Sequence, residues 1–383
     1  MKRTLLSLTL IAISSQTLAT ELYNGRISGM AGAGYVTAGY SDGLLFNPSL
    51  TASHKENDDF AIVINGGGLG SDKDDLIDGL DDLVEFTDYL KNASNLTLND
   101  ANKLKALMDN VDEKTLGASV GGSLVVAIPN SYLSAALVIK ATGTVGVLAD
   151  IDEDDYDLID NSISDPFEPE DLQSSVYGSG VILRETGIAL AKGFEVGGGQ
   201  QLLVGITPKR VKVETIVYEA TVADYDEDDL DADDYTVESS ASNLDAGVTY
   251  QTGKIRYGLA VQNIKSDSFK TIDGGTYELD TRTTAAVGYV SERFIAEAAF
   301  DLDAHTTFGL GAESQIFRAG LEYSALSWLQ LRAGLQRDLE DALPDAYSLG
   351  LGISPYNVFN IDLAGYTGSD ETVGGALQIG LRF

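Results

Sequence analysis

The chain ends with the stretch Leu377-Gln378-Ile379-Gly380-Leu381-Arg382-Phe383. Its four apolar side chains stand at the odd positions, and polar or small residues stand between them. Side chains alternate between the two faces of a β-strand, so this spacing predicts a strand with one apolar face and one polar face. The apolar face would contact a hydrocarbon phase or a protein core.

The same alternation continues upstream, and the connections between the apolar segments alternate between short and long. Short turns are predicted near 129–130, 197–199, 252–253, 291–292, 325–327 and 355–356. Long loops are predicted at 67–114, 149–172, 219–235, 265–275, 304–314, 338–345 and 367–373. Six short and seven long connections predict about 14 strands, beginning near 60–65, with 12 or 16 left open. Bacterial barrels place the short turns in the periplasm and the long loops outside.

The N-terminus has the features of a secretory signal. Lys2 and Arg3 precede an apolar run over 5–13, and Thr17-Leu18-Ala19 forms a small-residue cleavage pattern. We therefore expect a signal peptide at 1–19. No later stretch approaches the roughly 20 apolar residues that a membrane-spanning helix needs.

Acidic residues are concentrated in the predicted loops. The loops at 67–114, 149–172 and 219–235 hold 12, 11 and 9 of the 59 Asp and Glu residues. A charged side chain on the lipid face of a barrel costs about 2 to 4 kcal/mol at mid-depth, so this segregation is typical of a membrane barrel. The net charge of -34 argues against a nucleic-acid partner. The sequence thus predicts an all-β fold, a transmembrane antiparallel β-barrel over 59–383 in the bacterial outer membrane, with lipid around it.

The first long loop has a helical pattern. Leucines follow one helix face over 76–90 and another over 104–111, and Thr97 with Asp100 would cap the second helix. We expect an external helical lid at the barrel mouth, either contacting a ligand or merely covering the opening.

Residues 20–58 are rich in glycine, too few to fold alone and too apolar for a free tail, so we expect a plug inside the barrel. The run Gly29-Met30-Ala31-Gly32-Ala33-Gly34, then Asp42, then Phe46-Asn47-Pro48 resembles the N-terminal hatch of the FadL family of outer-membrane transporters. That family has fourteen strands and an Asn-Pro-Ala hatch motif, where this chain has Ser49. The pattern also resembles a related branch labelled as the plasmid-transfer TraF type, and the terminal strand resembles the barrel assembly signal, formed here by Leu377, Ile379, Leu381 and Phe383.

The FadL resemblance implies passive uptake of hydrophobic, fatty-acid-like small molecules, with a shift of the hatch and release through a lateral opening. Phe46, Asn47, Pro48 and Leu50 would form the hatch motif and ligand path, although Asn-Pro is also an ordinary turn. The TraF resemblance implies a non-transport barrel that serves conjugation or cell-surface assembly. A wide apolar path would favour transport, and a lumen filled by pairs such as Arg332 with Glu322 would favour the structural role. The assembly signal implies the barrel assembly machinery as a partner.

Neither an enzyme nor a metal or cofactor site is predicted. His54 and His305 stand in no catalytic pattern. The acidic runs 152–157 and 224–234 lack the spacing of an EF-hand loop, and 66–70 lacks the spacing of a dinucleotide turn. We expect solvated loops at these positions.

Overall fold

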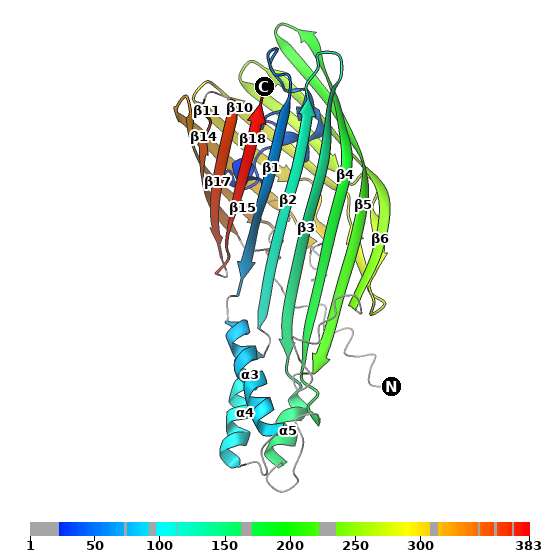
Figure 1. The fold of residues 1–383 in the computed structure, drawn as a ribbon, viewed down its shortest axis with the longest axis vertical. Helices are drawn as coiled ribbons and strands as arrows, with labels where there is room; N and C mark the ends of the chain where they lie inside the picture. The colour runs from blue at the N-terminus through cyan, green and yellow to red at the C-terminus, as the bar shows by residue number, and fades with distance from the viewer. Residues whose placement is uncertain are drawn as a thin grey trace.

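The computed structural model describes residues 23–72, 75–91, 97–112, 114–161, 171–221, 235–306, 313–343, 345–355, 358–369 and 371–383. The predicted signal peptide at 1–19 lies outside these residues. Within the described part, fourteen antiparallel strands close into one barrel (Figure 1). The fold prediction is therefore confirmed.

The barrel strands are β1 (Ala61–Ser71), β2 (Thr115–Ile128), β3 (Ser134–Asp150), β4 (Ser175–Gly197), β5 (Gln200–Thr221), β6 (Thr236–Thr252), β7 (Ile255–Gln262), β10 (Arg282–Val290), β11 (Phe294–Asp301), β14 (Ile316–Leu326), β15 (Leu329–Asp338), β16 (Ala346–Ile353), β17 (Phe359–Gly368) and β18 (Val373–Arg382). The first strand runs to Ser71, beyond the predicted start of the loop at residue 67. Gly67 allows this extension, because a Cβ there would lie 2.7 Å from the carbonyl oxygen of Gly375 on β18.

The first and last strands close the barrel. β1 pairs antiparallel with β18, Ile64 opposite Ile379, and the Phe383 amide donates to the Phe60 carbonyl at 2.8 Å. Leu377, Ile379 and Leu381 are exposed on the outer face, whereas Gln378 is fully buried in the lumen. The alternation at the C-terminus therefore separates a lipid face from a lumen face.

The strands differ greatly in length, and this difference shapes the molecule. β4 and β5 have 23 and 22 residues, whereas β16 has 8. A tilted strand crosses the membrane with about 9 to 11 residues, so β4 and β5 extend well beyond it. On the outer face of β5, the side chains change from apolar at Val204 and Ile206 to Arg210 and Lys212. The change marks the outer limit of the apolar band.

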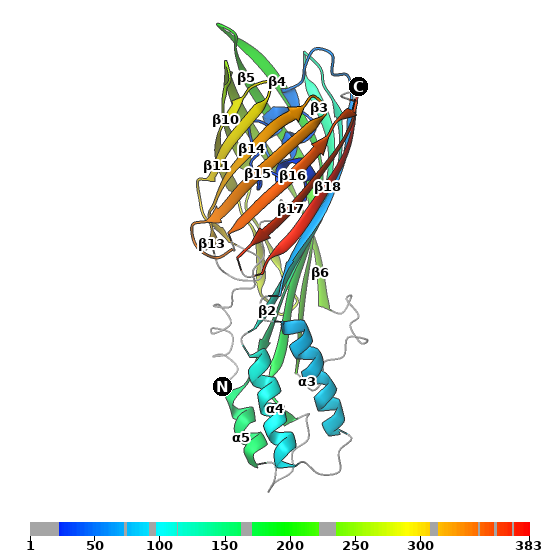
Figure 2. The ribbon, with the colours of Figure 1, turned by 90° about the vertical axis from the view of Figure 1, so that its left-hand side faces the viewer.

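Three helices lie beyond this extension at the long-loop end (Figures 1 and 2). They are α3 (Leu76–Lys91), α4 (Leu98–Val111) and α5 (Glu153–Asn161). Their apolar faces form a common core that includes Leu83, Leu104 and Ile159 and continues to Val176 of β4. Thr97 and Asp100 form the predicted capping box of α4. The lid prediction is wrong in its placement: the helices continue one side of the wall outward, because their apolar faces pack on β2 to β4 and on one another. None of the described helices is long and apolar enough to cross a membrane.

One predicted loop folds inward instead. The segment between β7 and β10 forms the hairpin of β8 (Asp267–Lys270) and β9 (Thr276–Leu279). Its stacked rings Phe269 and Tyr277 pack against Val211 and Val213, on the lumen face of β5. The hairpin therefore covers part of the lumen from the long-loop side. A second short hairpin joins β12 (His305–Thr306) and β13 (Glu313–Ser314).

The described part of the glycine-rich segment lies inside the barrel (Figure 2). It contains α2 (Gly25–Ser28) and two 3-10 helices, η2 (Gly43–Leu45) and η3 (Pro48–Ala52). The helix α2 packs on β16, β17 and β18, whereas η3 packs on β3 to β6. We call residues 23–53 the hatch.

Candidate functional site

The Asn47 amide organises the end of the hatch. Its Nδ2 donates to the Tyr35 carbonyl at 2.8 Å and to Thr249 Oγ1 of β6 at 3.2 Å. Its Oδ1 accepts from the Ser49 amide at 3.1 Å, and so caps η3, with Pro48 at the first helical position. The Ser49 hydroxyl binds both Asn47 Oδ1 and Thr249 Oγ1. The serine thus adds a link to the wall that an alanine could not make.

Three glycines of the wall receive this motif. A Cβ at Gly205 of β5 would lie 2.5 Å from the Pro48 carbonyl carbon, and one at Gly247 of β6 would overlap with Asn47 Oδ1. Gly258 of β7 likewise lies against the hatch. Any side chain at these positions would displace the motif, so the wall is shaped to hold it.

Phe46 and Leu50 lie in the core of the hatch. Phe46 is 1 % exposed and meets Tyr35 edge to face at 5.6 Å, and Leu50 is completely buried. The neighbouring Leu44 and Leu45 instead line a small chamber between the hatch and the wall. The structure thus brings the four predicted residues together but turns other side chains toward the lumen.

The other end of the hatch is held by ion pairs. Asp42 is completely buried and accepts from Arg382 of β18 at 2.9 Å, Arg26 at 3.4 Å and Gln378 at 3.2 Å. Burial alone would raise the pKa of the Asp42 carboxyl, but Arg382 and Arg26 more than offset this effect and lower the pKa below its usual value. Asp42 therefore carries its charge inside the barrel.

The same network continues across the wall. Arg26 donates to Glu322 of β14 at 3.1 Å, and Glu322 accepts from Arg332 of β15 at 2.8 Å. Arg332 also pairs with Asp362 of β17 at 2.7 Å. The predicted pair of Arg332 with Glu322 is therefore present in the lumen, and it is joined to the hatch through Arg26.

A further carboxylate binds the middle of the hatch. Glu297 of β11 accepts from the backbone amides of Tyr35 at 2.5 Å, Val36 at 3.2 Å and Thr37 at 2.8 Å. The Thr37 hydroxyl donates to the same carboxylate at 2.6 Å. Three consecutive amides are thus fixed by one wall side chain.

Charged residues also line the chamber at the other side of the hatch. Lys209 of β5 contacts Glu185 at 2.6 Å and Asp245 at 2.8 Å, and Lys140 pairs with Glu185. Together with Leu44 and Leu45 they surround a cavity of about 20 Å³, room for one water molecule. These four charged residues were not predicted from the sequence. The sequence does contain a signal for them, because an ionisable residue inside a membrane-spanning strand is expected to face the interior and to pair with a residue there.

The family described as "F plasmid transfer operon, TraF, protein" matches residues 44–303, more than half of the chain. The chain belongs to this TraF family. No curated protein matches it.

Solved structures share the fold of this TraF-family chain. A FadL homologue from Pseudomonas aeruginosa matches with a TM-score of 0.53 and 11% identity over 96% of this chain and 99% of the other. The toluene transporter TodX of P. putida matches with a TM-score of 0.53 and 11% identity, over 95% of this chain and 99% of the other. The monoaromatic hydrocarbon channel CymD matches with a TM-score of 0.52 and 11% identity, over 95% of this chain and 98% of the other. The TraF-family chain thus shares its barrel fold with these structures, which include a toluene transporter and a monoaromatic hydrocarbon channel.

The two histidines of the TraF-family chain form no open reactive site. His54 Nδ1 lies 3.0 Å from the Lys55 carbonyl, beside the Tyr40 ring. His305 Nε2 lies 3.2 Å from Ser314 Oγ, but Ser314 is completely buried, so a substrate cannot reach its hydroxyl. Among the described residues, no three His, Asp or Glu side chains gather as metal ligands would.

Proposed function

We propose that this chain is a gated passive channel for hydrophobic small molecules in the outer membrane. The supporting observation is the difference between the two sides of the hatch. On one side, Arg26 and Asp42 bind the wall through buried ion pairs. On the other, the hatch meets the wall through neutral hydrogen bonds of Asn47 and Ser49 to Thr249 and through apolar side chains. The shared apolar cluster contains Leu44, Leu45, Phe46 and Leu50 of the hatch with Val63, Val125, Ala127, Ala136, Val138 and Ala189 of β1 to β4.

Apolar contacts have no preferred direction, whereas ion pairs fix the geometry of their partners. A displacement of residues 44–50 would break neutral hydrogen bonds, each worth about 0.5 to 1.5 kcal/mol, whereas a displacement of residues 26–42 would break buried ion pairs, for which a lost partner costs about 3 to 5 kcal/mol. The displacement of residues 44–50 would open an apolar seam next to the chamber at Leu44 and Leu45. A hydrophobic molecule fits this seam because its walls carry aliphatic side chains.

Uptake measurements test this proposal. A strain that lacks the gene would be supplied with the wild-type chain, Leu45→Asp, or the matched control Leu339→Asp in an exposed loop. We expect uptake of a radiolabelled long-chain fatty acid or of toluene to require the barrel and to fall several-fold with Leu45→Asp alone. Equal uptake by cells with and without the barrel would refute the transport proposal.

The helical projection and the lumen pair of Arg332 with Glu322 favour a second candidate function, a role of the barrel in conjugation or cell-surface assembly. The helices α3, α4 and α5 have their own core outside the barrel, and this core continues onto residues of β2 to β4. Replacing residues 72–113 by a short turn would leave the hatch untouched. A loss of DNA transfer between cells, with unchanged hydrocarbon uptake, would support this candidate. Unchanged transfer would exclude it.

A further inference from the structure

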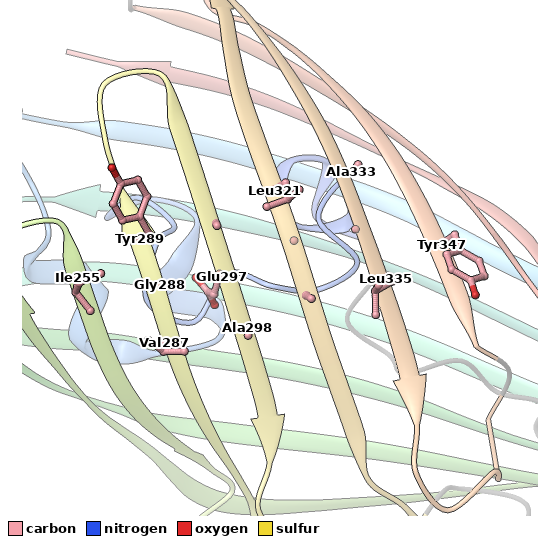
Figure 3. Close-up of a pocket in the computed structure, with 14 residues that line it drawn as sticks. Ile255, Val287, Gly288, Tyr289, Glu297, Ala298, Leu321, Ala333, Leu335 and Tyr347 are labelled. Carbon is pink, nitrogen blue, oxygen red and sulfur yellow. The ribbon is translucent and has the colours of Figure 1, made fainter.

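The outer wall of the barrel is hollowed over β10, β11, β14 and β15. Ala296 and Ala298 of β11, Ala319 of β14 and Ala333 of β15 form the floor of this hollow, with Ala298 directly opposite Ala319. Larger side chains stand around them: Ile255, Val287, Tyr289, Leu321, Leu335 and Tyr347. The cavity measures about 590 Å³ (Figure 3). We call this feature the alanine groove.

The alanine groove faces lipid and extends from Tyr289, at the short-turn end of β10, to Tyr347, at the long-loop end of β16. Its floor residues point to the outer face, while Glu297 between two of them points into the lumen. Tyr289 comes two residues before the short turn at 291–293, and Figure 3 shows its ring near this turn. Short turns mark the periplasmic side of bacterial barrels, and tyrosine prefers the interface there. Acyl chains of the periplasmic leaflet therefore reach the Tyr289 end of the groove.

Two basic residues, Lys254 and Arg293, belong to the short turns next to the Tyr289 end of the groove. The Nζ atom of Lys254 lies 5.9 Å from the ring centre of Tyr289, and the Lys254 carbonyl accepts from the Val290 amide. Arg293 is held in the next turn, where its carbonyl accepts from the Ser324 amide at 2.9 Å. Both side chains are exposed. Glu292 shares this turn, so the three groups carry one net positive charge on a chain with a net charge of -34.

We propose that the alanine groove binds one anionic phospholipid of the periplasmic leaflet. One acyl chain fills the groove, and the headgroup phosphate lies between Lys254 and Arg293. The apolar alanine groove matches the acyl chain of such a lipid, and the two exposed cations match its phosphate. Neither part of this site includes the hatch or the chamber. The inference is therefore independent of the transport proposal.

The wall beneath the lipid is thin. A Cβ at Gly320 or Gly334 on the lumen side would lie within 3 Å of Met30 of the hatch. Only the backbone and the alanine methyl groups thus separate the bound acyl chain from the hatch. The glycines and alanines together bring lipid and hatch closer than larger side chains would allow.

Native mass spectrometry of the full chain in detergent micelles tests the proposal, with phosphatidylglycerol and phosphatidylcholine as probes. We expect one phosphatidylglycerol to remain bound, several-fold more tightly than phosphatidylcholine. Each basic side chain near a lipid headgroup contributes about fivefold to the affinity for anionic lipid. Lys254→Gln combined with Arg293→Gln should therefore lower phosphatidylglycerol affinity about 25-fold. Ala298→Phe should weaken the binding of both lipids by filling the groove.

Two control variants separate the site from general lipid contact. Lys192→Gln removes another cation of the outer face, which lies over Tyr132 at 4.4 Å, and Ala141→Phe enlarges an exposed residue of β3. Both should retain the lipid. Equal retention in the groove variants, or equal loss in the controls, would overturn the proposal. A dimer that Ala298→Phe abolishes, without bound lipid, would show a second copy as the occupant and also overturn it. If Ala298→Phe does not assemble, Ala319→Leu and the double glutamine variant still decide the question.

Discussion

The substitution Asp42→Asn should loosen the hatch without opening the barrel. Asparagine keeps the shape of the side chain but removes the charge that Arg382 binds at 2.9 Å and Arg26 at 3.4 Å. Loss of one partner from a buried ion pair costs about 3 to 5 kcal/mol. The lower limit applies here, because Arg26 keeps Glu322 and the Arg382 side chain is 31% exposed. About 3 kcal/mol corresponds to roughly a hundredfold change in a local opening equilibrium.

Hydrogen exchange of backbone amides measures this equilibrium directly. In lipid nanodiscs, we expect amides of residues 25–50 to exchange about 100 times faster in Asp42→Asn, with unchanged exchange along β15 and β16. The matched control is Asp245→Asn, which breaks the buried pair with Lys209 on the wall. The control should leave hatch exchange as in the wild type. Equal exchange of the hatch in Asp42→Asn and the wild type, or an equal increase in both variants, would refute the ion-pair anchor.

Three further predictions concern pH, the glycines and the terminus. Because the pKa of Asp42 is lowered in the folded protein, its charge stabilises the hatch above about pH 4, and this stabilisation is lost as the pH falls below that value. Amide exchange of the hatch between pH 7 and pH 3 should show this loss. If the Asp42→Asn variant shows the same increase in exchange at acid pH, Asp42 is not the group responsible. Gly247→Ala should displace Asn47 and speed hatch exchange at least tenfold, whereas Gly365→Ala, with open space around its Cβ, should not; the reverse order would contradict the close fit. Phe383→Ala should reduce the amount of assembled barrel, seen as heat-modifiable migration in gels, and normal levels would show that the exposed terminal ring is dispensable.

The sequence predicted the barrel well because its signals are local. Alternation at 377–383 and the lengths of the connections depend only on neighbouring residues, and they sufficed for the strand number. The hatch motif was likewise found from 46–50. The direction of the helices was not predictable, because it depends on how far β4 and β5 continue past the membrane. Arg382, the wall cation that pairs with Asp42, and residues 35–37, which bind Glu297, lie hundreds of residues from these carboxylates, and only the closed barrel brings them together.

Because the strands differ in length, the long-loop end of the barrel is high on one side of its rim and low on the other. From Arg184 to Ser175, β4 continues for about 30 Å, at roughly 3.3 Å per residue, and α3 adds about 24 Å over its 16 residues. A tower of about 50 Å thus rises from one side of the rim, while the side of β15 to β17 ends near the membrane. Large particles or a neighbouring cell would meet the acidic tip of the tower first. Small solutes would reach the lumen from the low side, because the tower covers only the other side of the rim.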